Sequence, residues 1–345
     1  NNSKYKLIAK AIVEYVYTTS GSQEHPANKS DGSRGLVDWF TVPAMVQRSS
    51  FWGDNDGTVS ISTAALAGLL FDTDEMQQIV PKLLEQVFGL LRTTGTEGFR
   101  PASTSKGDMA KRGWRSFFDA TIGVGPQLSI PHMQANAWAI ALWAGHATGI
   151  GLFQKRVFTA TRLLMDRWPT KWTCMQTETE ELAHEVLVLA WLVRVNNTAQ
   201  PRAWLDAVAS DLIAHQRSCG AIKEWVNTTC IETFPTSNSG YGQGEGGLMQ
   251  ENTDPVADLL YAQNFALMSL HEAAHAIGLS TPAGQRYSRA VDQLAEFFVR
   301  VQVHSTDQPN IDGAWLRAVD VDKWEFWASG NDYGYGPWET ETGWT

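Results

Sequence analysis

Basic residues and long apolar runs are both scarce in this chain, and each shortage excludes a class of protein. Lys and Arg number 27 against 37 Asp and Glu, which gives a formal net charge of −10. Nucleic acids bind to basic surfaces, so this charge argues against a nucleic-acid partner and against a strongly polyanionic ligand. No run of about eighteen apolar residues occurs, so we expect no membrane-spanning helix.

Cysteine is also rare. The three cysteines are Cys174, Cys219 and Cys230, and no two of them form a Cys-x-x-Cys pair. This pattern argues against a zinc site made of thiolates. Cys219 and Cys230 flank a short turn-like stretch and are candidates for a disulfide that would leave Cys174 unpaired. Spacing alone does not decide this, because a bridge depends on the geometry of the two Cβ atoms.

Glycosylation signals are more frequent than chance predicts. Four Asn-x-Ser/Thr sequons occur, and the chain begins with Asn rather than Met, which indicates processing. We therefore expect a secreted, extracellular glycoprotein. The sequons begin at Asn1, Asn28, Asn196 and Asn227.

Apolar residues recur at helical spacing along most of the chain, whereas strand-like alternation is scarce. Leu7, Ile8, Ile12 and Val16, for example, fall on one stripe of a helix. The sequence therefore predicts an all-α fold. The expected helices cover residues 5–17, 63–71, 75–91, 106–120, 132–148, 152–168, 179–195, 201–215, 255–277 and 285–301.

The segments between the expected helices vary greatly in length. An array of tetratricopeptide or HEAT type would repeat every ~34 to 47 residues, and no such period is present. Long loops in compact domains are often functional. We expect one domain, residues 1–345, built as a closed toroid of helical hairpins with its long loops at one end. The long segments are 18–60, 93–131, 218–254 and 304–345.

The stretch 316–345 is rich in Trp, Tyr, Asp and Glu and carries a single Arg and a single Lys. Aromatic faces pack against the C–H faces of sugars, and carboxylates accept protons from sugar hydroxyls or act as acid and base. This composition favours a carbohydrate-active protein with an aromatic-lined cleft. The alternative is a Trp-rich tail that fills a helical domain.

Four segments resemble the six-hairpin glycosidase-like proteins, which are (α/α)6 toroids and include glycoside hydrolases and polysaccharide lyases. The segments are FWGDND (51–56), EELAHEVLVLAWLVRV (180–195), LMQENTDPVADLLYAQNFALMSLHEAA (248–274) and GAWLRAVDVDKWEFWASGNDYGYGPWETETGWT (313–345). The resemblance implies matching acidic positions at Asp54, Glu181, Glu251, Asp254, Asp332 and Glu341. It implies aromatic positions at Trp52, Trp315, Trp324, Trp327, Trp338 and Trp344.

The chain departs from that pattern at two places. Asp56 follows the Gly-Asp-Asn triplet, where a small residue is usual. The similar proteins also continue beyond the Gly-Trp-Thr sequence into another helix, whereas this sequence ends at Thr345. The expected toroid is therefore one without its final helix.

The resemblance and the loop chemistry together predict a glycoside hydrolase that uses two carboxylates. Glu251 follows a glycine-rich stretch and is our candidate general acid, with Asp54 or a carboxylate of the C-terminal loop as base or nucleophile. Asp254 stands where a helix N-cap belongs, before Pro255. The predicted catalytic set is Glu251, Asp54, Asp332, Glu341 and Glu181.

Acidic residues in a first helical turn also complement the helix dipole, which explains most of the Glu residues at 178–185 without any catalytic role. Among these residues, the resemblance supports a catalytic role only for Glu181. The predicted substrate-binding set comprises aromatic platforms and polar groups that orient the sugar. It consists of Trp52, Asn55, His132, Asp254, Arg317, Trp327, Tyr335 and Trp338.

Two alternatives concern the same scaffold. A polysaccharide lyase abstracts a proton beside a uronate carboxyl, and suitable groups are present at His132, Tyr261, Tyr333, Tyr335 and Arg317. A non-catalytic glycoprotein that binds glycans or joins an extracellular assembly would also carry the sequons. We expect a glycan or oligosaccharide ligand in each case and no cofactor.

A third alternative comes from a short motif. His271-Glu272-Ala273-Ala274-His275 matches the HExxH signature of zinc peptidases, with two His on one helix face. Thr281 stands at the position of the third ligand, and Glu296 is the remaining carboxylate candidate. The motif is short and also arises by chance in helical proteins, so we predict no metal site.

Overall fold

The computed structural model describes residues 50–52, 74–101, 103–105, 111–122, 130–174, 177–226 and 254–327, together with the helical positions Leu7 and Ala11. The chain divides into two compact units. One consists of Asn1–Ser129 and Met133–Asp166, and the other of Ile130–His132 and Arg167–Thr345. A single domain over residues 1–345 stays a prediction.

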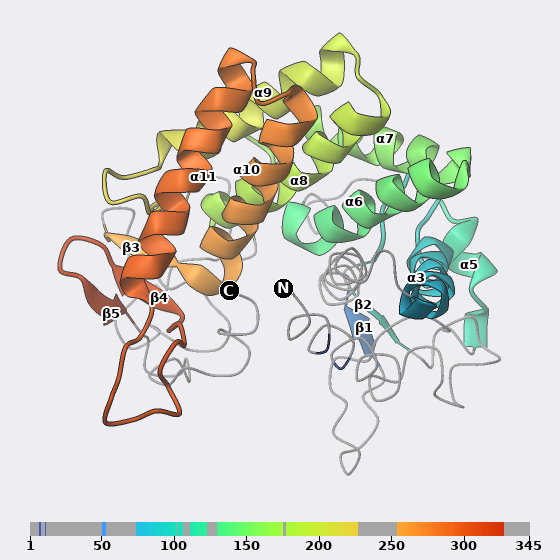
Figure 1. Cartoon of the computed structure of the whole chain (residues 1–345). Coiled ribbons are helices and arrows are strands. Elements are labelled where there is room, and N and C mark those ends of the chain that lie inside the picture. Colours follow the sequence, from blue (N-terminus) through green and yellow to red (C-terminus); the bar gives the residue numbers. More distant parts are fainter. Residues whose placement is uncertain are drawn as a thin grey trace. The chain divides into compact units, whose positions relative to one another are not determined.

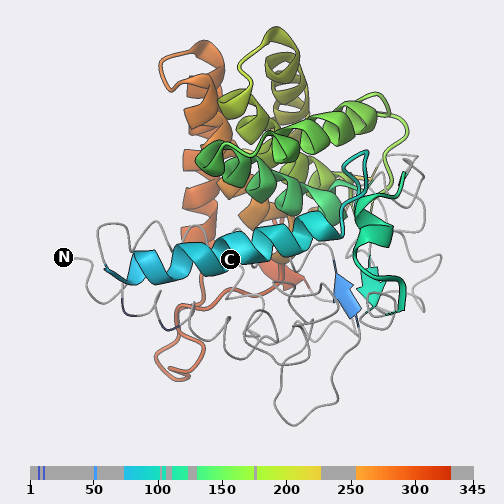
Figure 2. The same ribbon diagram turned by 90° about the vertical axis from the view of Figure 1, so that its right-hand side faces the viewer.

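The first unit is a helical assembly with a small two-stranded sheet. The strands are antiparallel and pair Phe51 with Thr104. Figure 2 shows the longest of its described helices, α3, along its length. The elements are β1 (Ser50–Trp52), α3 (Asp74–Arg92), β2 (Ser103–Ser105), α5 (Arg115–Phe118), all but the first turn of α6 (Pro131–Thr148), and α7 (Gly151–Met165).

Buried polar contacts tie the loop after α3 to α6. The Trp138 indole Nε1 donates to the carbonyl of Gly98 at 2.8 Å. The Gln134 side chain accepts from the Arg100 amide at 3.0 Å and donates to the Arg100 carbonyl at 2.8 Å. Gly98 has φ +89°, and a Cβ there would lie 2.2 Å from the Arg156 carbonyl oxygen, so only glycine fits.

The second unit contains two helical hairpins. Helix α8 (Glu178–Val195) packs against α9 (Ala199–Ala214) and α10 (Asn264–Ile277), and α10 packs against α11 (Pro282–Val301) (Figure 1). Helix α8 is buried on every side over its first thirteen residues. Helix α11 instead buries one face, which includes Tyr287, Leu294 and Phe297. The central and peripheral helices therefore differ as layered helical folds require.

A three-stranded antiparallel sheet completes this unit. Its order is β3 (Val256–Asp258), β4 (Ala318–Asp320) and β5 (Glu325–Trp327). Asp258 lies opposite Ala318, which lies opposite Trp327. Residues directly opposite each other share a face of a sheet. Asp258 and Trp327 are therefore on the same face.

The helix expected over 255–277 begins later than predicted. Residues 256–258 form β3, and the π-helix η3 (Leu259–Gln263) precedes α10. The expected N-cap at Asp254 is therefore wrong. Asp258 is the N-cap, because its Oδ1 accepts the amides of Leu260 at 2.8 Å and Tyr261 at 3.2 Å. Pairing with β4 overrides the helix-start signal of Pro255.

The other expected helices agree more closely. The helices over 75–91, 132–148, 152–168, 179–195, 201–215 and 285–301 are confirmed, with shifted ends. Of the helix expected over 106–120, the described residues show the helical positions 111–112 and α5. Residues 63–71 and most of 5–17 lie outside the described residues. Among the described residues, no helix is long and apolar enough to cross a membrane.

The cysteines differ from the pairing considered above. Cys174 is in a disulfide and Cys219 is a free thiol, so the Cys219–Cys230 bridge is wrong. Cys219 lies in a tight turn, in which the Gly220 amide donates to the Arg217 carbonyl at 2.9 Å. Sequence spacing carries no information about the direction of a Cβ atom in such a turn.

Candidate active site

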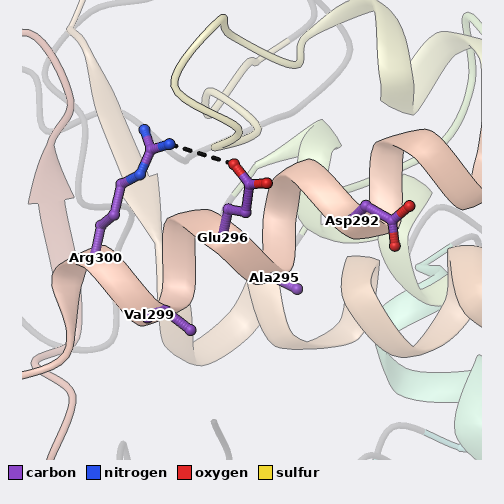
Figure 3. A pocket seen from close by; sticks show the side chains of 5 residues that line it. All are labelled: Asp292, Ala295, Glu296, Val299 and Arg300. Carbon is purple, nitrogen blue, oxygen red and sulfur yellow. Dashed lines mark hydrogen bonds and ion pairs between the residues drawn. The ribbon is translucent and has the colours of Figure 1, made fainter.

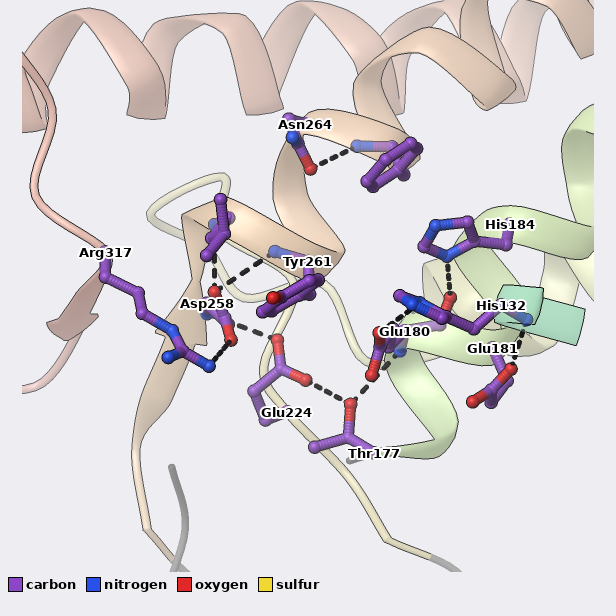
Figure 4. Close-up of polar contacts among 12 residues, drawn as sticks. His132, Thr177, Glu180, Glu181, His184, Glu224, Asp258, Tyr261, Asn264 and Arg317 are labelled. Carbon is purple, nitrogen blue, oxygen red and sulfur yellow. Dashed lines mark hydrogen bonds and ion pairs between the residues drawn. The ribbon is translucent and has the colours of Figure 1, made fainter. Parts of the chain in front are cut away.

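Carboxylates and a histidine meet in the second unit where three helices begin. His132 belongs to the first turn of α6, Glu180 and Glu181 to the first turn of α8, and Asp258 is the N-cap of η3. Glu224 joins them from the segment after α9 (Figure 4). Helix N-termini present unpaired N–H groups and a partial positive charge, so three of them together favour carboxylates. We call Glu180, Glu181, Glu224, Asp258 and His132 the acid cluster.

His132 is held by two carboxylates. Its Nδ1 lies 2.5 Å from the Glu180 Oε1, and its backbone amide donates to the Glu181 Oε2 at 2.6 Å. The ring centroid lies 4.9 Å from that of His184 and 5.7 Å from that of Tyr261. His132 is buried, with 4% of its surface exposed, and Glu180 and Glu181 are completely buried.

Glu224 connects α8 to β3. Its Oε2 accepts a hydrogen bond from the Thr177 hydroxyl at 2.5 Å, and its Oε1 accepts one from the Asp258 amide at 3.2 Å. The Thr177 oxygen in turn accepts the Glu180 amide at 3.1 Å. Burial raises the pKa of the Glu224 carboxyl well above its ordinary value, and the neighbouring charge of Asp258 adds to this rise.

Asp258 has neighbours of both charges. Its Oδ2 lies 3.6 Å from the Arg317 Nη2, and the Arg317 guanidinium carbon lies 5.1 Å from the centre of the Tyr261 ring. Burial raises the pKa of Asp258 to about 6, although Arg317 opposes the rise; the Glu180 charge adds to it. Both Asp258 and Arg317 are buried, whereas Tyr261 is partly exposed.

A further carboxyl lies one helical turn beyond Glu181. Glu185 is completely buried, and neither of its oxygens forms a hydrogen bond within the described part of the chain. Burial raises its pKa well above the ordinary value, and the charge of Glu181 raises it further. Both effects favour the protonated form of the Glu185 carboxyl.

The arrangement suits proton transfer. A carboxylic acid with a pKa near 6 keeps its proton in part of the molecules near neutral pH, which is the property of a general acid. Perturbed pKa values of this kind concentrate at functional sites. The π-helix beside Asp258 adds to the pattern, because π-helical turns are frequent at functional sites.

The predicted site residues fall into three groups. Glu181, His132 and Arg317 lie in or against the acid cluster. Trp327 is partly buried and packs against Val226 and Ala318 on the sheet face that carries Asp258.

Asp254 is partly buried just before β3, and Trp52 belongs to β1 in the first unit. Asn196 is the C-cap of α8. The rest lie outside the described residues: Asp54, Asn55, Glu251, Asp332, Tyr335, Trp338, Glu341 and the sequons Asn1, Asn28 and Asn227.

The contacts of Glu181 give it a structural role, because its carboxylate accepts an amide at the beginning of α6. Its catalytic role stays a prediction. Sequence reasoning did not select Glu180, Glu224 or Asp258. Glu180 was indistinguishable from its acidic neighbours, and Glu224 carried no signal. Asp258 did carry one, since it is a lone acid in the apolar stretch Val256–Leu260.

The HExxH motif does not assemble a peptidase site among the described residues. His271 and His275 are exposed, Glu272 forms an ion pair with Arg194 at 2.8 Å, and Glu296 forms one with Arg300 at 3.3 Å. Within the described ranges, no three His, Cys, Asp or Glu side chains are placed to hold a metal ion.

A shallow hollow on α11 is also separate from the acid cluster. Figure 3 shows that its lining comes from this one helix, with the Glu296–Arg300 pair along one side. No polar group from a second described element converges on it, so it is not a candidate active site. It is lined by Asp292, Ala295, Glu296, Val299 and Arg300.

Comparison with known proteins identifies the fold. No protein-family profile and no curated protein matches the chain. A sugar epimerase from a ruminal bacterium has 10% identity over 92% of this chain and 76% of that chain, with a TM-score of 0.54. An unsaturated glucuronyl hydrolase from Bacillus sp. GL1, responsible for the degradation of glycosaminoglycan, has 14% identity over 82% of this chain and 72% of that chain, with a TM-score of 0.48.

A structure of UGL with dGlcA-Glc-Rha-Glc has 12% identity over 76% of this chain and a TM-score of 0.47, and the chain spans 66% of its length. Identities this low compare folds and not activities. The mostly helical architecture and the similarity to the epimerase agree with the expectation from the sequence. The chain therefore has a mostly helical fold of the (α/α)6-toroid type.

Proposed function

We propose that the protein is a carbohydrate-active enzyme, a glycoside hydrolase that acts on a glycan, and that the acid cluster belongs to its active site. The single observation that carries the proposal is the buried Asp258 carboxyl, whose pKa is raised to about 6 and which lies among the other carboxyls of the acid cluster. Glycoside hydrolysis needs one carboxylic acid that is still protonated at working pH and a second carboxylate nearby.

Asp258 is the proposed general acid. Its pKa of about 6 lets it give a proton to the oxygen of a leaving sugar near neutral pH. Glu224 holds the Asp258 amide, and Glu180 raises the pKa of Asp258 through its charge. These two residues therefore position and tune the acid.

The surroundings of Asp258 fit a sugar. Trp327 is two strands away on the same face of the sheet, which corresponds to roughly 10 Å at ordinary strand spacing. Tyr261 is partly exposed and follows Asp258 in η3. Aromatic rings near a carboxyl can stack a pyranose beside an acid. The fold is shared with a protein named as a sugar epimerase, which supports carbohydrate chemistry on this scaffold.

The test is a panel of neutral and uronate-containing polysaccharides, with new reducing ends as the readout. We expect reducing ends without the ultraviolet absorbance of unsaturated uronates. Asp258→Asn should lower kcat by roughly 10²- to 10⁴-fold, the usual contribution of a general acid. Asp206→Asn is the matched control, because Asp206 is a half-exposed acid on α9 that pairs with Arg286.

The rate should fall as pH rises through about 6, because the general acid then loses its proton. Thermal unfolding of each variant shows whether it is folded. Turnover by folded Asp258→Asn equal to that of Asp206→Asn would contradict the assignment of Asp258. Binding without turnover across the panel would favour a non-catalytic glycoprotein.

Proton abstraction is the second candidate, as in a lyase. The observation that favours it is the convergence of His132, Tyr261 and Arg317, three of the residues suited to that chemistry. An arginine binds a carboxylate, and a histidine or tyrosine takes the proton beside it. Unsaturated uronate products, lost in Tyr261→Phe, would support this candidate over hydrolysis.

A further inference from the structure

The two histidines of the HExxH motif have no part in the proposed glycan chemistry. His271 and His275 are one turn apart on α10, and both are exposed. Their ring centroids lie 4.5 Å apart. Side chains four positions apart on a helix are neighbours on its surface, so the two rings form a pair that faces solvent.

This geometry suits chelation of a metal ion. Imidazole nitrogens bind transition metals at about 2.0–2.1 Å, so two nitrogens on one ion must approach within roughly 3–4 Å of each other. Rings with centroids at 4.5 Å reach that separation by rotation of the side chains alone. Within the described residues, neither ring forms a hydrogen bond or an ion pair, so binding disrupts no such contact there.

The glutamate of the motif, Glu272, already pairs with an arginine. The Glu272 carboxylate accepts from the Arg194 Nη2 at 2.8 Å. Glu296, the other candidate ligand, pairs with Arg300 on α11. Among the described residues no third ligand joins the pair, so solvent fills the remaining positions of a bound ion.

We propose that His271 and His275 form a two-histidine surface site for a divalent transition-metal ion, with Cu²⁺ bound more tightly than Ni²⁺ or Zn²⁺. Neutral imidazoles suit copper, nickel and zinc, whereas Mg²⁺ and Ca²⁺ require oxygen ligands. The order among the three metals follows the general stability series for nitrogen ligands. The site binds metal without peptidase chemistry, and it does not depend on the proposed glycan activity.

The experiment is calorimetric titration of tag-free protein with CuCl2, NiCl2 and ZnCl2, together with electron paramagnetic resonance of the Cu²⁺ complex. We expect a saturable site in which the Cu²⁺ spectrum reports two nitrogen ligands. His271→Ala and His275→Ala should each weaken Cu²⁺ binding at least tenfold, because a chelate becomes a single ligand. MgCl2 and CaCl2 should give no binding heat at this site.

His304→Ala is the matched control, because His304 is highly exposed and lies outside α10. The affinity of the His304→Ala variant for Cu²⁺ should equal that of the unmodified protein. Metal that binds only the folded state also raises the melting temperature, and the two α10 variants should lose that rise while the control keeps it. Unchanged Cu²⁺ affinity in His271→Ala would overturn the proposal. So would a paramagnetic resonance spectrum with two nitrogen ligands in the variant that carries both His271→Ala and His275→Ala.

Discussion

Acidic residues at the beginning of α8 and acidic residues on α9 and α11 have opposite environments. Glu180 is completely buried against His132, and Glu185 is buried without a hydrogen bond among the described residues. Glu296 and Asp206 are instead exposed and pair with Arg300 and Arg286. Water screens the charges of the exposed acids on α9 and α11. The buried acids of α8 have lost their hydration, and they contact helix N-termini and one another instead.

The difference shows that the number of acidic residues in a segment does not determine the pKa values of their carboxyls. Both regions are acidic in sequence, but in the buried region desolvation raises the pKa values of Glu185, Glu224 and Asp258. The core of the second unit therefore holds its carboxyls at a cost in stability, which the following experiments measure.

The largest effect is expected from Glu180→Ala. Removing Glu180 leaves the buried His132 Nδ1 without the carboxylate beside it, and truncating one partner of a buried charged pair costs about 3–5 kcal/mol of unfolding free energy. Urea denaturation at pH 7 measures it. Glu296→Ala on α11 should change stability by less than about 1 kcal/mol, because that ion pair is exposed. Equal losses in both variants would remove the distinction between the two regions.

Asp258→Asn should change how stability depends on pH. The folded-state pKa of about 6 exceeds the ordinary 3.8, so ionising Asp258 costs folding energy that is absent below pH 3.8 and complete above about pH 6. The cost approaches about 3 kcal/mol. The variant should therefore gain roughly that much relative to the unmodified protein between pH 4 and pH 7, as measured by urea denaturation. A constant difference across this range would contradict the raised pKa.

Glu185→Met should change the free energy of unfolding in the opposite direction to Glu180→Ala. A buried carboxyl without a hydrogen bond costs about 1–3 kcal/mol, and a methionine of similar length removes that cost. We expect a higher melting temperature for Glu185→Met and little change for Glu185→Gln. A lower melting temperature in Glu185→Met would show that the carboxyl has a binding partner in solution.

Asp206→Ala should have a smaller effect than the changes at Glu180, Asp258 and Glu185. Asp206 Oδ1 accepts from Arg286 at 2.6 Å and from the Tyr287 hydroxyl at 3.0 Å, and its side chain is half exposed. Loss of both contacts should cost about 1 kcal/mol in urea denaturation. The double variant with Tyr287→Phe should cost little more, because the two changes remove a shared hydrogen bond.

The helices could be predicted from the sequence because their signals are local. Apolar spacing located α8 and α11, and it placed the end of α10 at residue 277. The beginning of α10 could not be predicted. Asp254 and Pro255 form a good helix start, but β3 pairs with a strand some sixty residues away, and this contact decides the structure.

The candidate site could be predicted only in part. Glu181 was selected through the resemblance, and His132 and Arg317 as polar groups suited to binding a sugar or to lyase chemistry. All three gather in one place. Glu224 could not be found, because its role arises from Thr177 and Asp258, which are distant in sequence. Burial and the meeting of helix ends are tertiary properties, and no local pattern reports them.

The π-helix η3 is a place where the chain can tolerate the deletion of one residue. A π-helical turn contains one residue more than an α-helical turn, so Leu259–Gln263 can lose a residue and leave α10 continuous. One residue corresponds to about 100° of helix rotation. A single deletion here would turn the segment that carries Tyr261 relative to α10 while the packing of α10 against α8 and α11 is preserved. A one-codon deletion is therefore a route by which the site can acquire a new shape without loss of the fold.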